Sequence, residues 1–171
     1  MSTDTHSGDA PKIQLHQPKA ELYLPREACA SEALKKATHL GVGAHQDDLE
    51  FMALHGILEC YDCGERHFGG ITCTDGGGSA RQGPFAGITD EAMQEIRAEE
   101  QREAARIGQY TYMAQLAYPS SRIKDPVAAE HLVNDLVQLL KSGSVEVVYT
   151  HNLADKHSTH IAVTAALIKA I

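Results

Sequence analysis

Four short apolar runs alternate with longer segments of helical periodicity, and this alternation constrains the fold of the chain more than any other feature. The apolar runs lie at residues 38–44, 67–74, 112–117 and 145–150. Apolar residues recur at helical spacing over residues 50–62, 90–108, 126–141 and 159–171. Strands that alternate with helices in this way build a mainly parallel sheet with right-handed crossovers. The sequence therefore predicts an α/β fold in which helices cover such a sheet.

Length and charge limit the domain count and the classes of partner. The chain has 171 residues, the size of one domain. Residues 1–20 are polar and lack periodicity, so we expect a flexible N-terminal arm followed by one domain over residues 21–171. The formal net charge of -8 argues against binding to nucleic acid or to an anionic membrane. The sequence shows neither a signal peptide nor an apolar run of membrane-spanning length, which predicts a cytoplasmic protein.

A histidine and two adjacent carboxylates follow the first apolar run, where residues 44–50 read Ala-His-Gln-Asp-Asp-Leu-Glu. Open α/β sheets bind ligands at the carboxyl ends of their strands. His45 and one carboxylate are a partial ligand set for a divalent ion, with zinc favoured and ferrous iron or another divalent metal acceptable. The other carboxylate could take a proton from water that the metal activates. Asp47 or Asp48 could instead cap the next helix, but a cap explains only one of the two.

The remaining ligand of such a site must come from a distant part of the chain, because catalytic zinc usually has three protein ligands. Residues 150–160 follow the last apolar run and contain His157 and His160, whose spacing lets both point to one side of a helix. Asp155 could accept a hydrogen bond from one of these rings and so support it. Together with the motif around His45, this pattern favours a metal site over coincidence.

A glycine-rich loop at residues 75–84 follows the second apolar run. Its backbone N–H groups could approach a ligand closely, and Arg81 could reach an anion or sugar hydroxyls. The loop could also be a plain connection, although loops of this length tend to be functional. In the next helical segment, Arg97 and Glu100 fit a solvated helix face with i,i+4 ion pairs, and the alternative is that they brace the site.

Cys60 and Cys63 form a Cys-x-x-Cys motif at the end of the first long helical segment. In a cytosolic chain this motif suggests metal binding or redox chemistry before a disulfide framework. No second pair follows, however, and two small buried residues three apart are common at the end of a helix. Packing is therefore the favoured interpretation, and redox chemistry or metal binding is the alternative.

The two histidine motifs, paired and in this order, closely resemble the LmbE/PIG-L family of zinc-dependent N-acetylglucosaminyl deacetylases. The resemblance covers residues 38–171 and includes the glycine-rich loop and the Arg97-x-x-Glu100 helix. It implies a Rossmann-like three-layer sandwich and a hydrolase that removes the acetyl group from an N-acetylglucosamine-type amino sugar or its conjugate. Members of the family continue beyond the second motif, so we expect the LmbE-like domain of residues 21–171 to be truncated at its C-terminus.

The resemblance also implies a role for each site residue. His45, Asp48 and His160 would bind Zn²⁺, Asp47 would be the general base, and His157 would stabilise the oxyanion or protonate the leaving amine. Arg81 would contact the substrate, and Asp155 would support a ligand. The sequence departs from the family where Gln46 replaces a common proline and where Thr159 replaces a common aspartate, which leaves the orientation of His157 dependent on Asp155.

Two other functions compete with this one. A nucleotide-binding Rossmann protein is suggested by Gly41-x-Gly43, but Gln46 stands where that pattern needs glycine, and Asp47 and Asp48 would repel a pyrophosphate. A non-catalytic sugar- or metal-binding Rossmann-like module would keep the site without turnover. In every case the expected partner is a small molecule, and assembly into a homo-oligomer is compatible with the sequence.

Overall fold

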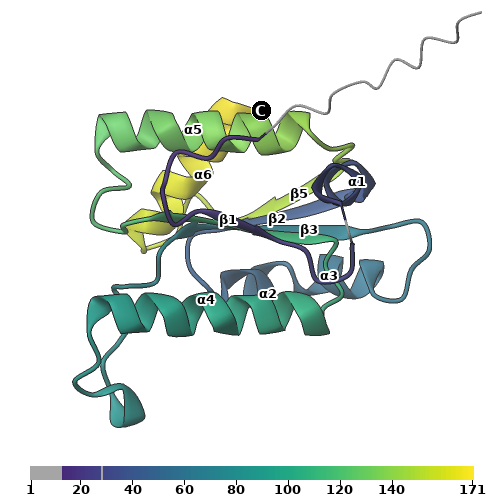
Figure 1. Ribbon diagram of the computed structural model, residues 1–171. Helices are drawn as coiled ribbons and strands as arrows, with labels where there is room; N and C mark the ends of the chain where they lie inside the picture. The colour runs from purple at the N-terminus through teal and green to yellow at the C-terminus, as the bar shows by residue number, and fades with distance from the viewer. Residues whose placement is uncertain (1–12, 28) are drawn as a thin grey trace, which may run out of the picture.

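The computed structural model describes residues 13–27 and 29–171, and Figure 1 shows their arrangement. Within these residues a five-stranded sheet has the order β1-β4-β3-β2-β5. The strands are β1 (Glu21–Tyr23), β2 (His39–Gly43), β3 (Phe68–Thr74), β4 (Tyr112–Tyr118) and β5 (Val147–Thr150). Strands β2 to β5 are parallel, whereas β1 pairs antiparallel with β4 at one edge. The predicted mainly parallel sheet is confirmed.

Helices cover both faces of this sheet. They are α1 (Ala30–Lys36), α2 (Asp48–Met52), α3 (Leu54–Cys60), α4 (Asp90–Ile107), α5 (Pro126–Lys141) and α6 (Ser158–Ala170). Figure 1 shows α5 and α6 on one side of the sheet and α2, α3 and α4 on the other. The structure is therefore a Rossmann-like three-layer α/β sandwich. Every helix in the described part of the chain is too short or too polar to span a bilayer.

The helix predicted over residues 50–62 is wrong in its continuity and in its buried face. The structure has two helices, α2 and α3, with a break at Ala53. Phe51, which the helical spacing places in the core, is 84% exposed, whereas Leu49 and Ala53 are fully buried. A helix that is interrupted does not keep one rotational phase, so the apolar spacing across the break does not mark a single face.

Glycines in the central strands let α2 pack closely on the sheet. A Cβ on Gly41 would lie 2.9 Å from a Leu49 methyl, and one on Gly70 would lie 3.0 Å from the other Leu49 methyl. Only a residue without a side chain leaves this space, and filling a packed interior forces strain. Since Asp48 is the neighbour of Leu49, this close packing also places Asp48 at the carboxyl end of β2.

The expected flexible arm is wrong for residues 13–20, which pack on the domain; residues 1–12 lie outside the described part. Ile13 and Leu15 contact the core cluster under α5. Asp135 of α5 is fully buried, and its carboxylate accepts hydrogen bonds from the ring Nδ1 of His16 at 2.6 Å and from the Tyr118 hydroxyl at 2.7 Å. A buried carboxylate requires such donors, so it holds the N-terminal segment against the domain.

Replacing Tyr118 with phenylalanine should test this buried network. The substitution removes the hydroxyl that donates to the Asp135 carboxylate, and a hydrogen bond to a charged group is worth about 2 kcal/mol. We expect the free energy of unfolding to fall by that amount in urea denaturation. Tyr61→Phe is the control, because the Tyr61 side chain is exposed and its loss of a hydroxyl should have little effect. Equal stability of the two variants would contradict the network.

Candidate metal centre

The candidate centre lies where the carboxyl ends of β2 and β5 meet. These two strands are adjacent and parallel, and Val42 pairs with Thr150 near their ends. His45 therefore comes from the loop after β2, and His157 and His160 come from the start of α6, which follows β5. Residues more than a hundred positions apart in the sequence are brought together because the strands that precede them share one edge of the sheet.

Three predicted ligands place their donor atoms at mutual distances that suit one ion. His45 Nδ1 lies 3.2 Å from His160 Nε2 and 3.4 Å from an oxygen of Asp48. The other oxygen of Asp48 lies 3.6 Å from His160 Nε2. Ligands that bind tetrahedral zinc at 2.0–2.1 Å are separated from one another by about 3.3 Å. The residues present therefore fit a divalent ion.

Asp155 determines which nitrogen of His160 is free. Its carboxylate lies 3.0 Å from His160 Nδ1, and its other oxygen accepts the backbone N–H of His157 at 2.7 Å. These contacts lower the pKa of Asp155, the His157 amide being the larger cause. A proton held on Nδ1 leaves the lone pair of Nε2 directed at the centre, as is usual for metal-binding histidines. Asp155 therefore orients the ring of His160, whereas its contact with His157 is to the backbone N–H alone.

We expect Asp155→Ala to lower the affinity for Zn²⁺ by about 10- to 100-fold, since second-layer partners of metal-binding histidines have effects of that size. Titration with a competing chelator would measure this change. Asn152→Ala is a matched control in the same loop, because the Asn152 side chain accepts a hydrogen bond from Ala154 and does not contact His160. Equal zinc affinities of the two variants would argue against the support by Asp155.

The electrostatics keep Asp48 ionised in spite of its burial. Burial alone would raise its pKa, but the proximity of His151, whose Nε2 lies 3.2 Å from an Asp48 oxygen, and hydrogen bonds from His45 outweigh that effect and hold the pKa well below its usual range. The shortest of these bonds is from the backbone N–H of His45, at 2.6 Å. A carboxylate that stays ionised is available as a ligand without first losing a proton.

His151 is a member of the cluster that sequence reasoning did not single out. Donor atoms fall into two groups that share His160, one with His45 and His157 and the other with Asp48 and His151. The Nε2 of His151, however, accepts the backbone N–H of Ala44 at 2.9 Å. Its lone pair is thereby occupied, so the geometry favours His45 over His151 as the ligand. Its place directly after β5 was the signal that could have identified it.

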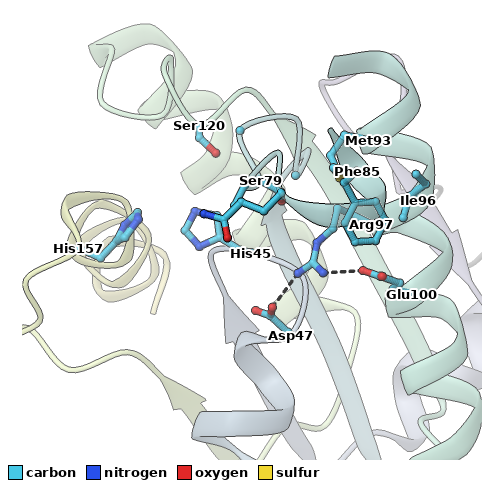
Figure 2. Close-up of a pocket in the computed structure, with 14 residues that line it drawn as sticks. His45, Asp47, Ser79, Phe85, Met93, Ile96, Arg97, Glu100, Ser120 and His157 are labelled. Atoms are coloured by element: carbon cyan, nitrogen blue, oxygen red, sulfur yellow. Dashed lines mark hydrogen bonds and ion pairs between the residues drawn. The ribbon is translucent and has the colours of Figure 1, made fainter. Parts of the chain in front are cut away.

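Asp47 stands beside the metal centre in a constrained conformation. Its φ of 86° lies in the left-handed region, and its backbone N–H donates to Gln101 at 3.1 Å. Arg97 of α4 donates to the Asp47 carboxylate at 2.7 Å and to Glu100 at 2.5 Å, as the dashed lines in Figure 2 show. The same guanidinium donates to the backbone carbonyl of Gln46 at 2.5 Å. Arg97 thus braces the loop, which is the alternative the sequence left open.

A cavity of about 590 Å³ opens over Asp47, His45 and His157. Figure 2 shows these side chains around one space, with apolar side chains of α4 and of the loop before it on the far wall. The glycine-rich loop supplies part of the lining through Gly76, Gly78, Ser79, Ala80 and Gln82. A cavity of this size accommodates a small organic ligand.

The structure places Arg81 away from this lining. Its guanidinium donates to the backbone carbonyls of Gly77 at 2.8 Å and of Ile88 at 3.1 Å, and to the carboxylate of Asp90 at 2.5 Å. Arg81 therefore ties the loop to itself and to α4, whereas Arg97 is the guanidinium that lines the cavity. The predicted contact of Arg81 with substrate would require these bonds to be exchanged.

A search against protein-family models matches residues 40–171 to PIG-L, described as GlcNAc-PI de-N-acetylase. The chain belongs to the PIG-L family. The predicted resemblance is confirmed. A search of the curated proteins gave no significant match.

Among solved structures, this PIG-L family chain is similar to the conserved protein TT1542 from Thermus thermophilus. The TM-score is 0.60 at 24% sequence identity, over 78% of this chain and 55% of that protein. The likeness supports the fold, and the chain spans little more than half the length of this relative.

Proposed function

We propose that this PIG-L family chain carries the catalytic residues of a metal-dependent N-deacetylase, which hydrolyses the acetamide of an N-acetylglucosamine-type amino sugar or conjugate to acetate and a free amine. The observation that carries the proposal is the convergence of three ligand-type side chains at 3.2–3.6 Å beside one cavity that Asp47 and His157 also line. The family match supports the reaction class.

His45, Asp48 and His160 would hold the divalent ion. When bound, the ion would polarise the acetamide carbonyl and lower the pKa of water. Asp47 would accept the proton of the attacking water; its place in the lining of the same cavity and the ion pair with Arg97, which holds its carboxylate, support this role.

His157 lies on the opposite side of His45 from Asp47 in Figure 2. Its ring is 4.9 Å from that of His45 and 4.5 Å from that of His160, between centroids. Partial burial and the neighbouring histidines lower the pKa of His157. In its protonated form the ring can donate to the developing oxyanion or to the leaving amine, which are the roles proposed for it.

The cavity walls support an amino-sugar conjugate as the substrate. Polar backbone of the glycine-rich loop forms one part of the lining, and Phe85, Met93 and Ile96 form an apolar part. A sugar presents hydroxyls at its edge and C–H groups on its face, so both kinds of wall have a counterpart in the ligand.

The test uses the chain loaded with Zn²⁺ and an N-acetylglucosamine conjugate, with amine and acetate measured together. We expect equal amounts of both products, none after metal is removed by a chelator, and recovery when Zn²⁺ is returned. A chain that binds zinc and the conjugate but releases neither product would instead be a non-catalytic binding module.

A further inference from the structure

The Cys60-x-x-Cys63 motif lies far from the metal centre and forms a tight turn at the end of α3. The N–H of Cys63 donates to the carbonyl of Cys60 at 3.2 Å. Between them, Tyr61 has φ -67° and ψ 128°, and Asp62 has a positive φ of 50°. These are the conformations of a type II turn, which brings its first and fourth Cα atoms within about 7 Å. Disulfides bridge Cα separations of about 4.4–6.8 Å, so the turn brings the two Cα atoms into the range that a disulfide requires.

Neighbouring residues fix this turn in place. The side chain of Gln109 contacts both polar ends of Asp62: its amide nitrogen donates to the carboxylate at 2.9 Å, and its oxygen accepts the backbone N–H at 3.4 Å. Arg26 donates to the same oxygen of Gln109 at 2.7 Å. The turn is therefore preorganised by contacts with the segments before α1 and after α4.

The two thiols differ in their surroundings. Cys60 is 8% exposed, and burial raises its pKa to about 11. Cys63 is only partly buried, and its sulfur accepts the backbone N–H of Arg66 at 3.4 Å. Hydrogen bonds from the amides of Glu65 and Arg66 and from the Arg66 side chain lower the pKa of Cys63. Cys60 is buried, as the packing interpretation expects, whereas the partial exposure of Cys63 and the lower pKa of its thiol make Cys63 the cysteine that ionises more readily.

Both cysteines line a cavity of about 250 Å³. Arg26 and Lys36 lie on its wall with a single carboxylate, Glu27, which pairs with Lys36 at 2.7 Å. Among the lining residues this leaves one cation, Arg26, whose hydrogen-bond partner is the neutral side chain of Gln109. This charge favours a small thiol compound that bears carboxylates.

We propose that Cys60 and Cys63 form a thiol–disulfide exchange site that reacts with a carboxylate-bearing low-molecular-weight disulfide. The Cys63 thiolate attacks one sulfur of the disulfide, forming a mixed disulfide and releasing the first thiolate. Cys60 then attacks the sulfur of Cys63, and its proton goes to the second released thiolate. The protein dithiol is oxidised to the Cys60–Cys63 disulfide, and the small disulfide is reduced to two thiols.

The full chain, in a Cys29→Ser background that removes the exposed thiol of Cys29, is treated with oxidised glutathione. Peptide mass spectrometry then identifies the products. We expect an internal Cys60–Cys63 disulfide in the parent and a stable mixed disulfide at Cys63 in the Cys60→Ser variant. In Cys63→Ser we expect loss of reaction at Cys60. Cys73, which is fully buried, should stay reduced throughout and reports that the chain is folded.

Two outcomes would overturn the proposal. One is a folded parent, with Cys73 still reduced, that forms no Cys60–Cys63 disulfide. The other is reaction of Cys60 without Cys63. Equal reaction rates with oxidised glutathione and with the neutral 2-hydroxyethyl disulfide would overturn the proposed preference for carboxylate-bearing disulfides. An unchanged reaction rate of Lys36→Gln with oxidised glutathione would overturn it as well.

Discussion

Replacing Asp47 with asparagine is expected to lower amine release by roughly a hundred- to ten-thousand-fold, the usual contribution of a general base, while zinc content stays at the parent level. Asparagine cannot accept the proton of the attacking water. It does tolerate the left-handed backbone that Asp47 adopts at φ 86°, where alanine would add strain. The comparison therefore isolates the loss of the base from a change in the loop.

Glu100→Gln is the matched control for this prediction. Glu100 also lines the cavity and pairs with Arg97, but it is not placed in a proton-transfer role. We expect this variant to keep most of its activity and all of its zinc. If Asp47→Asn and Glu100→Gln lost activity equally, the effect would come through Arg97, and parent-level activity of Asp47→Asn would remove the proposed base.

Replacing His160 with alanine is expected to lower zinc affinity by more than about 100-fold and to abolish activity. This loss exceeds the one expected for Asp155→Ala, because His160 would bind the ion directly and Asp155 only supports its ring. His160 Nε2 lies 3.2 Å from His45 Nδ1 and 3.6 Å from Asp48, so removing it opens one corner of the ligand set. Metal analysis after dialysis against a weak chelator measures the loss directly.

His151→Ala is the informative comparison, because the His151 ring stacks on that of His160 at 3.9 Å between centroids. Its Nε2 accepts the Ala44 amide, so we expect His151→Ala to lose some stability and to keep one zinc per chain. The opposite pattern, with zinc retained in His160→Ala and lost in His151→Ala, would show that the ligand assignment is wrong.

Local signals in the sequence were sufficient for most of the elements. The helix predicted over residues 126–141 has those bounds in the structure, because Asp125 caps its first turn through hydrogen bonds to the backbone N–H groups of Val127 and Ala128. Buried parallel strands are apolar on both faces, which made β3 and β4 visible as continuous runs. The same periodicity was wrong for α2 and α3, where a break at Ala53 changes the buried face.

The sequence by itself determined the α/β class, the family and the residue types of a metal site after two of its strands, since these depend on neighbours within a few positions. Only the tertiary structure decided that Arg97 braces the Asp47 loop and that the Ala44 amide occupies His151. The physical reason is that such contacts depend on strand order and register. Strand order and register bring segments more than fifty residues apart within hydrogen-bond distance. The residues next to each partner in the sequence do not indicate which segments will meet.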